Sequence, residues 1–137
     1  METKTVGVVV LEGNKVLLVR HLKGGNHITD TFGLPAGRLE VGEDHVHGAI
    51  RELKEETGLD VTVSDLIQLP IEYHAVLKRK TGEEAMVWRV YKCRKFSGNL
   101  QDSEETSPLW VEINKLDSIN LVSNVNNAIQ QALDYQS

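Results

Sequence analysis

Three glutamates in the stretch RELKEETG, residues 51–58, have the types and spacing to hold a divalent cation. If the stretch is helical, successive residues are rotated by about 100°, and Glu52, Glu55 and Glu56 then share an arc of roughly 100°. Acids three and four residues apart repel each other, and the helix dipole disfavours acids in the last turns. Carboxylates gathered at this cost are typical ligands of Mg²⁺ or Mn²⁺. A solvated acidic face is the alternative interpretation.

The segment that carries these acids has the periodicity of an amphipathic helix over residues 43–57. Its apolar positions recur at spacings of three and four residues: Val46, Ala49, Ile50, Leu53 and Thr57. Gly58 is predicted to end the helix in a left-handed conformation, followed by the hydrophobic Leu59. The acidic arc borders the apolar arc, so we expect the glutamates to lie at the edge of the core.

The rest of the chain supplies strands and one more helix. The expected elements are a hairpin over 5–20 turning at 12–14, a loop over 21–42 with a short strand near Phe32, strands at 61–73, 85–96 and 109–113, a hairpin turn at 78–84, and a helix over 124–136. Strands mixed with two helices indicate a single α/β domain over residues 1–137.

Composition restricts the classes of partner. The chain of 137 residues has a net charge of -5 and a pI near 5.5, which argues against binding long nucleic acid. No apolar run reaches the length of a membrane span, and residues 1–4 do not open a signal peptide. Cys93 is the one cysteine, so no disulfide framework is expected. These features predict a cytoplasmic protein that acts on a small ligand.

Residues 37–59, GRLEVGEDHVHGAIRELKEETGL, resemble the Nudix box at every position that the box specifies. The matching residues are Gly37, Glu43, Arg51, Glu52, Leu53, Glu55, Glu56, Gly58 and Leu59. The preceding FGLPAG is similar to the lead-in of that family. The resemblance implies a Nudix-type α/β/α sandwich, with a mixed β-sheet between helices. It also implies hydrolysis of a nucleoside diphosphate linked to another moiety, with Mg²⁺ or Mn²⁺.

The resemblance assigns roles by position. Glu55 and Glu56 would be metal ligands, and Glu52 would be a further ligand or the base that activates water. The Gly37 carbonyl would also bind metal, and Arg51 would orient the glutamates by ion pairing.

Two more acids have roles implied by the resemblance. Glu43 would hold the loop to the helix. Glu105 lies in a polar loop that supplies a ligand or catalytic base in several family members, and we include it as a catalytic candidate. An ordinary solvated loop is the alternative for Glu105.

Candidates for substrate binding come from cations and aromatic residues. The cations that could approach phosphates are Arg20, Lys23, Lys78, Arg79 and Lys80, and Arg20 has the best case because it ends a predicted strand. Phe32 is a candidate for stacking on a base, whereas Trp88 and Trp110 are expected in the core. The histidines lack an HExxH pair, so packed or exposed histidine is the default interpretation.

The substrate implied by the resemblance is a small nucleotide, with nucleoside triphosphates favoured. Ala36 is similar to some ADP-ribose hydrolases, but Ala75 stands where those enzymes carry a marker proline. An ADP-ribose or ADP-sugar pyrophosphatase and a non-catalytic nucleotide-binding module are the alternatives, and a capped RNA end fits the acidic chain less well. Family members are often homodimers, although no segment of this sequence indicates an interface.

Overall fold

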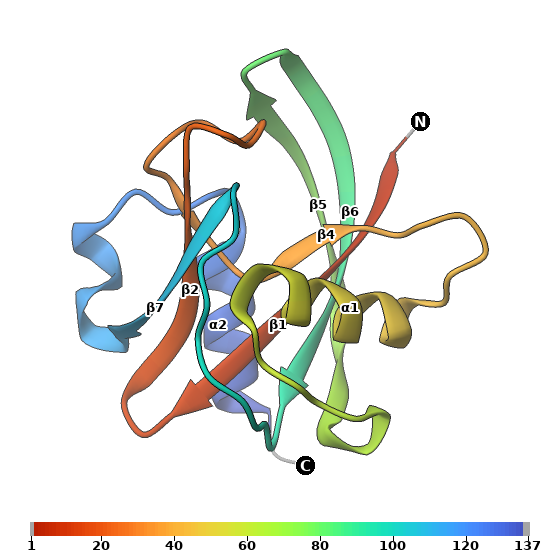
Figure 1. Cartoon of the computed structure of the whole chain (residues 1–137), viewed down its shortest axis with the longest axis vertical. Helices are drawn as coiled ribbons and strands as arrows, with labels where there is room; N and C mark the ends of the chain where they lie inside the picture. Colours follow the sequence, from red (N-terminus) through yellow and green to blue (C-terminus); the bar gives the residue numbers. More distant parts are fainter. Residues whose placement is uncertain (1, 136–137) are drawn as a thin grey trace.

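The computed structural model describes residues 2–135, which form a mixed seven-stranded sheet between two helices (Figure 1). The strands are β1 (Thr3–Glu12), β2 (Lys15–His21), β3 (Phe32–Gly33), β4 (Ala36–Arg38), β5 (Leu66–Arg79), β6 (Gly82–Cys93) and β7 (Thr106–Glu112). The helices are α1 (His45–Thr57) and α2 (Val125–Asp134), with 3₁₀ turns η1 (Val63–Asp65) and η2 (Ile113–Ser118). The predicted α/β/α sandwich is therefore confirmed.

Strand β1 is the centre of the sheet. It runs parallel to β6 from Thr3 to Val10, and its last residues pair antiparallel with β2 through Leu11 and Val16. The short strand β4 lies along the other edge of β1, with Gly37 opposite Val6. This pairing brings the backbone of the predicted Gly37 ligand into the sheet, beside α1.

Two hydrophobic cores separate the sheet from the helices, because successive β1 side chains point to opposite faces. Val6, Val8 and Val10 pack toward Leu53 of α1. Val9 packs on the other face with Ile129 of α2 and its neighbours. Helix α1 is thus fixed by its apolar stripe, and its acidic arc is left at the edge of that interface.

Several predicted elements are confirmed and others are corrected. The first hairpin turns at residues 13 and 14, as predicted. The strand predicted at 61–73 is wrong at its start, because Thr62 and Asp65 form a capping box that nucleates η1. The turn predicted at 78–84 is too long: Arg79 pairs with Gly82, so the strands continue to a two-residue turn.

The last elements also differ at their ends. Strand β7 begins at Thr106, three residues before the predicted start. Helix α2 begins after Asn124, which has a φ of 68°, and its helical part ends at Asp134; residue 136 of the predicted helix lies outside the described residues. Strand β4 was not predicted at all. Over residues 2–135, neither helix has the length and apolar content needed to cross a membrane.

The core predictions for single residues hold. Trp88 is buried on the α2 side of the sheet, and Trp110 packs against the α1 core. Cys93 is buried, and burial raises the pKa of its thiol to about 11, so it behaves as a small apolar residue.

Candidate functional site

Local capping fixes where α1 begins and ends. The Asp44 side chain accepts a hydrogen bond of 2.9 Å from the backbone N–H of His47, so the helix starts two residues later than predicted. Gly58 has a φ of 86°, and its N–H donates to the Lys54 carbonyl, which confirms the predicted C-terminal cap. The three glutamates therefore occupy the last two turns of a fixed helix.

The carboxyl group of Glu52 lies against the backbone of Gly37. A Cβ atom at Gly37 would overlap that carboxyl group, so a residue with a side chain there would displace the Glu52 carboxylate. Strand β4 holds the Gly37 backbone in place by pairing with β1. The space beside Gly48, one turn before Glu52, is occupied instead by the side chains of Leu39 and Glu43.

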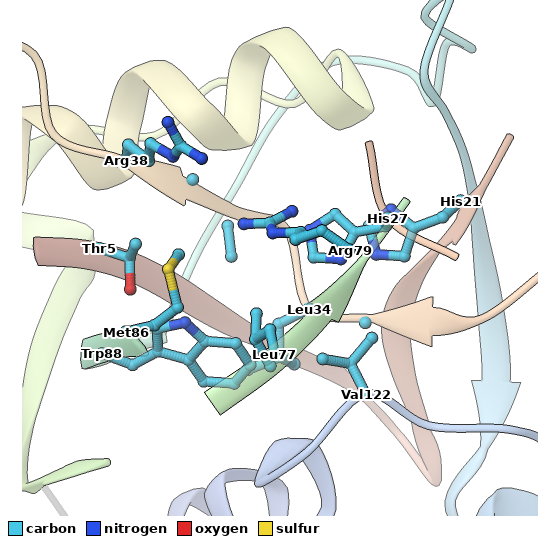
Figure 2. Close-up of a pocket in the computed structure, with 13 residues that line it drawn as sticks. Thr5, His21, His27, Leu34, Arg38, Leu77, Arg79, Met86, Trp88 and Val122 are labelled. Carbon is cyan, nitrogen blue, oxygen red and sulfur yellow. The ribbon is translucent and has the colours of Figure 1, made fainter. Parts of the chain in front are cut away.

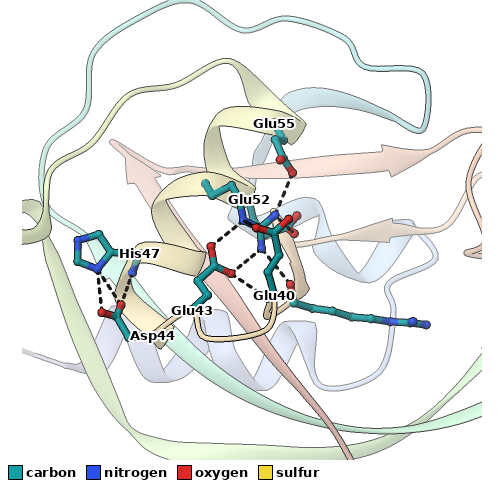
Figure 3. Close-up of polar contacts among 8 residues, drawn as sticks. Glu40, Glu43, Asp44, His47, Glu52 and Glu55 are labelled. Carbon is teal, nitrogen blue, oxygen red and sulfur yellow. Dashed lines mark hydrogen bonds and ion pairs between the residues drawn. The ribbon is translucent and has the colours of Figure 1, made fainter.

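Arg51 gathers the acids of the helix and of the preceding loop (Figure 3). It donates two hydrogen bonds of 2.8 Å to Glu43, one of 2.8 Å to Glu52 and one of 3.1 Å to Glu55. It also donates to the Arg38 carbonyl at 3.0 Å. The hydrogen bonds from Arg51 hold the pKa of Glu43 down at about 2.

Glu52 and Glu56 are the least hydrated of the three acids. Burial raises the pKa of Glu52 to about 7, although Arg51 opposes that rise. Burial also raises the pKa of Glu56 well above its ordinary value, and its carboxylate accepts a hydrogen bond of 2.7 Å from the Ala36 N–H. Arg51 and the Ala36 N–H offset only part of the cost of burying these two carboxylate charges. Two such carboxylates this close together favour a cation beside them.

Glu55 differs from its neighbours because 56% of its side chain is exposed. In the part of the chain that the structure describes, no three His, Cys, Asp or Glu side chains converge at metal-ligand geometry. The carboxylates of Glu52 and Glu55 accept hydrogen bonds from Arg51, and that of Glu56 accepts one from the Ala36 N–H. The four predicted ligands, Gly37, Glu52, Glu55 and Glu56, are neighbours, and their metal binding stays a prediction.

The other sequence candidates lie at different distances from the glutamates. Glu105 is exposed in the loop before β7, and its negative charge contributes to the raised pKa of Glu56, so the two are close in space. Thr106 adds a hydrogen bond of 3.2 Å to the Glu56 carbonyl. Arg20 is half exposed and lies 3.8 Å from Asp30.

Phe32 packs partly buried against the α2 core and pairs across the strands with Arg20. Neither residue lines the pocket beside β4 that is described next. The structure does not test a role for either in binding substrate, so both roles stay predictions.

A pocket lies beside β4, and Figure 2 draws the residues that line it. Its apolar lining includes Leu34, Leu77, Met86, Trp88 and Val122, and its polar lining includes Thr5, His21, His27, Arg38 and Arg79. Ala36 and Gly37 also line it, so the pocket is one strand away from the acids.

Sequence reasoning missed most of the polar residues in this pocket. His21 and His27 stack with their ring centroids 3.9 Å apart, and burial is the main cause that lowers their pKa values to about 4 and about 3. Arg79 appeared only within a run of surface cations, yet its side chain is 9% exposed. No local pattern signals this burial, because the walls come from strands far apart in the sequence.

Similarity to known proteins shows the family of the chain. The NUDIX domain profile matches residues 1–132. The chain belongs to the Nudix family. It is 34% identical over 106 residues to a MutT-like protein of Streptomyces ambofaciens, an alignment that spans 77% of this chain and 60% of that protein.

Two further likenesses agree. Nudix hydrolase 5 of Arabidopsis thaliana is 29% identical over 109 residues, which are 79% of this chain and 35% of that protein. A MutT NUDIX hydrolase from Burkholderia pseudomallei has the same Nudix fold, with a TM-score of 0.81, 21% identity, and coverage of 96% of this chain and 98% of that one. This chain thus spans less than two thirds of the length of the curated relatives named here, 35% of one and 60% of the other.

Proposed function

We propose that this chain hydrolyses a pyrophosphate bond in a nucleoside diphosphate linked to another moiety, and that nucleoside triphosphates are its substrates. The observation that carries the proposal is the contact between Gly37 and Glu52. It brings a backbone strand against an acidic helix turn that also carries Glu55 and Glu56. The Nudix membership of the chain supports the same reaction.

The residues fit the divalent cation that the family uses. All the candidate donors are oxygen atoms, from three carboxylates and the Gly37 carbonyl, and Mg²⁺ and Mn²⁺ prefer such hard ligands. Glu52 and Glu56 are buried beyond what Arg51 and the Ala36 N–H compensate, since both have raised pKa values. We infer that Gly37, Glu52, Glu55 and Glu56 hold Mg²⁺ or Mn²⁺.

The bound cation would neutralise phosphate charge and polarise the phosphoryl group. The chain's own residues supply the positioning. Glu52 is the candidate base for a water, because its carboxylate is fixed between Arg51 and the Gly37 backbone. Glu105 is the second candidate base, from the loop beside Glu56.

Arg51 acts as a positioning residue. Its five contacts restrict the rotamers of Glu43, Glu52 and Glu55, so the acids need little reorganisation when substrate binds. It binds Glu52 through Oε1 and Glu55 through Oε2, so the second oxygen of each carboxylate accepts no hydrogen bond from Arg51 and could face a cation.

The test measures phosphate and pyrophosphate release from the four nucleoside triphosphates, and formation of AMP and ribose 5-phosphate from ADP-ribose, with Mg²⁺ present and after chelation. We expect metal-dependent turnover of triphosphates that falls by at least about 100-fold in Glu52→Gln or Glu56→Gln, the scale of losing an acid–base group. Glu12→Gln, at an exposed turn, is the matched control. Full turnover by Glu56→Gln would remove the proposed site.

If the protein hydrolyses ADP-ribose and no triphosphate, the ADP-ribose pyrophosphatase alternative is correct and the triphosphate proposal is wrong. Tight nucleotide binding without turnover would indicate the non-catalytic module. We also propose that the protein acts in the cytoplasm; a fluorescent fusion at native expression tests this location.

A further inference from the structure

Arg79 is a buried cation whose hydrogen-bonding capacity is mostly unused. Its Nε donates to the Glu84 carboxylate at 3.2 Å. Within residues 2–135, no protein atom accepts a hydrogen bond from its two terminal nitrogens, although 91% of the side chain is covered. A guanidinium that is mostly covered and uses only Nε on the protein can gain hydrogen bonds from the acceptors of a ligand.

The unused nitrogens are reached through the pocket. No fully buried side-chain nitrogen or oxygen in the described residues lacks a hydrogen bond, so the terminal nitrogens of Arg79 keep some exposure, and Arg79 is one of the residues that line the pocket. In Figure 2 the Arg79 side chain lies beside the stacked rings of His21 and His27 and above Leu77. A ligand in the pocket would meet two adjacent donors and no charged acceptor.

The remaining walls favour a flat apolar ligand over a bare phosphate. Leu77, Met86 and Trp88 form an apolar floor, against which a phosphate would lose its hydration. His21 and His27 are uncharged at neutral pH, because burial and the nearby Arg79 lower their pKa values. Apolar walls with a few placed polar groups are typical of a site for a ring, and because the enclosed space is only about 40 Å³, a purine would lie at the open mouth of the pocket against these walls.

Glu84 fixes the direction of Arg79. Its Oε1 accepts hydrogen bonds from Arg79 and from Arg38, the latter at 2.7 Å, and its Oε2 accepts one of 3.0 Å from Thr3. Because Glu84 binds Arg79 through Nε, the two terminal nitrogens stay parallel and free. Arg38 also lines the pocket, but 57% of its side chain is exposed, so it is less suited than Arg79 to select a base.

We propose that Arg79 selects the base of the substrate, donating from its two terminal nitrogens to the adjacent O6 and N7 acceptors of a 6-oxopurine, with Glu84 as the positioning residue. Adenine presents its N6 amino group beside N7, so a donor of the base would face a donor of Arg79. This inference rests on the proposed nucleotide hydrolysis and names the base that the same site prefers.

The first experiment compares kcat/KM for GTP, ITP and ATP with the full chain. ITP retains O6 and N7 but lacks the 2-amino group of GTP. We therefore expect GTP and ITP to be used within a few-fold of each other, and both about tenfold or more better than ATP, the scale of one bidentate contact. Equal use of GTP and ATP overturns the inference, and so does a preference for GTP that ITP does not share.

Variants then test the residues. Arg79→Lys keeps the charge and loses the paired donors, so the GTP-to-ATP ratio should fall toward one. Glu84→Gln should lower the same ratio because Arg79 is no longer held by a carboxylate. Arg94→Lys and Glu83→Gln, at exposed positions away from the pocket, are the matched controls and should keep the ratio. Since the ratio compares substrates on one protein sample, partial unfolding does not change it. An unchanged ratio in Arg79→Lys overturns the inference.

A binding measurement separates this inference from the proposed function. Calorimetry with GMP, IMP and AMP in the absence of metal requires no turnover. Stronger binding of GMP and IMP than of AMP, without hydrolysis of any triphosphate, would leave the pocket assignment standing while the proposed function fails. Hydrolysis of triphosphates with equal binding of the three monophosphates would do the reverse.

Discussion

Arg51 and Glu43 form a bidentate ion pair, with two hydrogen bonds of 2.8 Å between the guanidinium and the carboxylate. Glu43 lies in the loop before α1 and Arg51 in the second turn of the helix, so the pair ties the loop to the helix. The Glu43 side chain is only 14% exposed, which makes the pair stronger than an ordinary surface ion pair.

Replacement of Glu43 by Gln should destabilise the protein by roughly 2 kcal/mol at pH 7, the scale of hydrogen bonds to a charged group. The pKa of Glu43 lies near 2 in the folded protein against an ordinary value of 4.5. Its contribution is therefore present above pH 4.5 and is lost as the pH falls toward 2. Urea unfolding at pH 7 and pH 3 measures this: the difference between wild type and Glu43→Gln should shrink at the lower pH.

Glu40→Gln is the control for that pair. Glu40 lies in the same loop, 3.5 Å from Arg51, but 67% of its side chain is exposed. We expect a change below about 0.5 kcal/mol. An effect as large as that of Glu43→Gln would mean that net charge, and not the bidentate contact, stabilises the loop.

Gly37→Ala should damage both folding and catalysis, because the added Cβ overlaps the Glu52 carboxyl group. The carboxylate ends a flexible side chain and moves more readily than the strand, so the loss of stability is at most about 1 to 3 kcal/mol and the carboxylate loses its position for catalysis. Gly7→Ala is the control, since a Cβ there meets its nearest neighbour, Ala36, at an ordinary 3.6 Å. Thermal unfolding and turnover of both variants provide the measurement. A Gly37→Ala protein with normal stability and turnover would contradict the close contact.

Glu56→Gln should stabilise the protein in metal-free buffer while it removes activity. The amide oxygen can still accept the Ala36 N–H, but no charge has to be buried. The folded-state pKa of Glu56 is raised, so the wild type loses stability as the pH climbs above the ordinary value of 4.5, whereas the variant does not. The gain in Tm over the wild type should therefore be larger at pH 8 than at pH 5. A variant that is less stable at both pH values would contradict this account.

Added Mg²⁺ or Mn²⁺ should raise the Tm of the wild type, and more so at pH 8 than at pH 5. At low pH the cation must displace protons from Glu52 and Glu56, whose pKa values are raised by burial. The shift should disappear in Glu56→Gln and persist in Glu12→Gln. Differential scanning fluorimetry over this pH range gives the measurement. If the metal raises the Tm of Glu56→Gln as much as that of the wild type, the metal binds elsewhere.

The sequence predicted best what depends on neighbours along the chain. The α1 periodicity, the Gly58 cap and the glycine turn of the first hairpin are all local signals, and the structure confirms them. The Nudix box adds spacing that relates Gly37 to Glu52, and the two do touch. These features required no knowledge of tertiary packing.

What the sequence could not predict depends on contacts between distant segments. Strand β4 has three residues, two of them Ala36 and Gly37, and exists because β1 offers it a free edge. Arg79 is buried because His27 bridges to it and Lys80 donates to the Asn26 carbonyl, which folds the loop over the end of β5. A run of three cations in the sequence gives no indication of which one faces inward.

The long parallel pairing of β1 with β6 has a consequence for synthesis of the chain. Residues Thr3 to Val10 must wait for partners that lie about eighty positions later, from Met86 to Cys93. Until then this valine-rich segment has only the short strand β4 to pair with, at Thr5 to Gly7, while β2 pairs beyond it at Leu11 and Glu12, and such segments aggregate readily. The apolar strand that organises the finished sheet is thus also the part of the nascent polypeptide in most need of a chaperone.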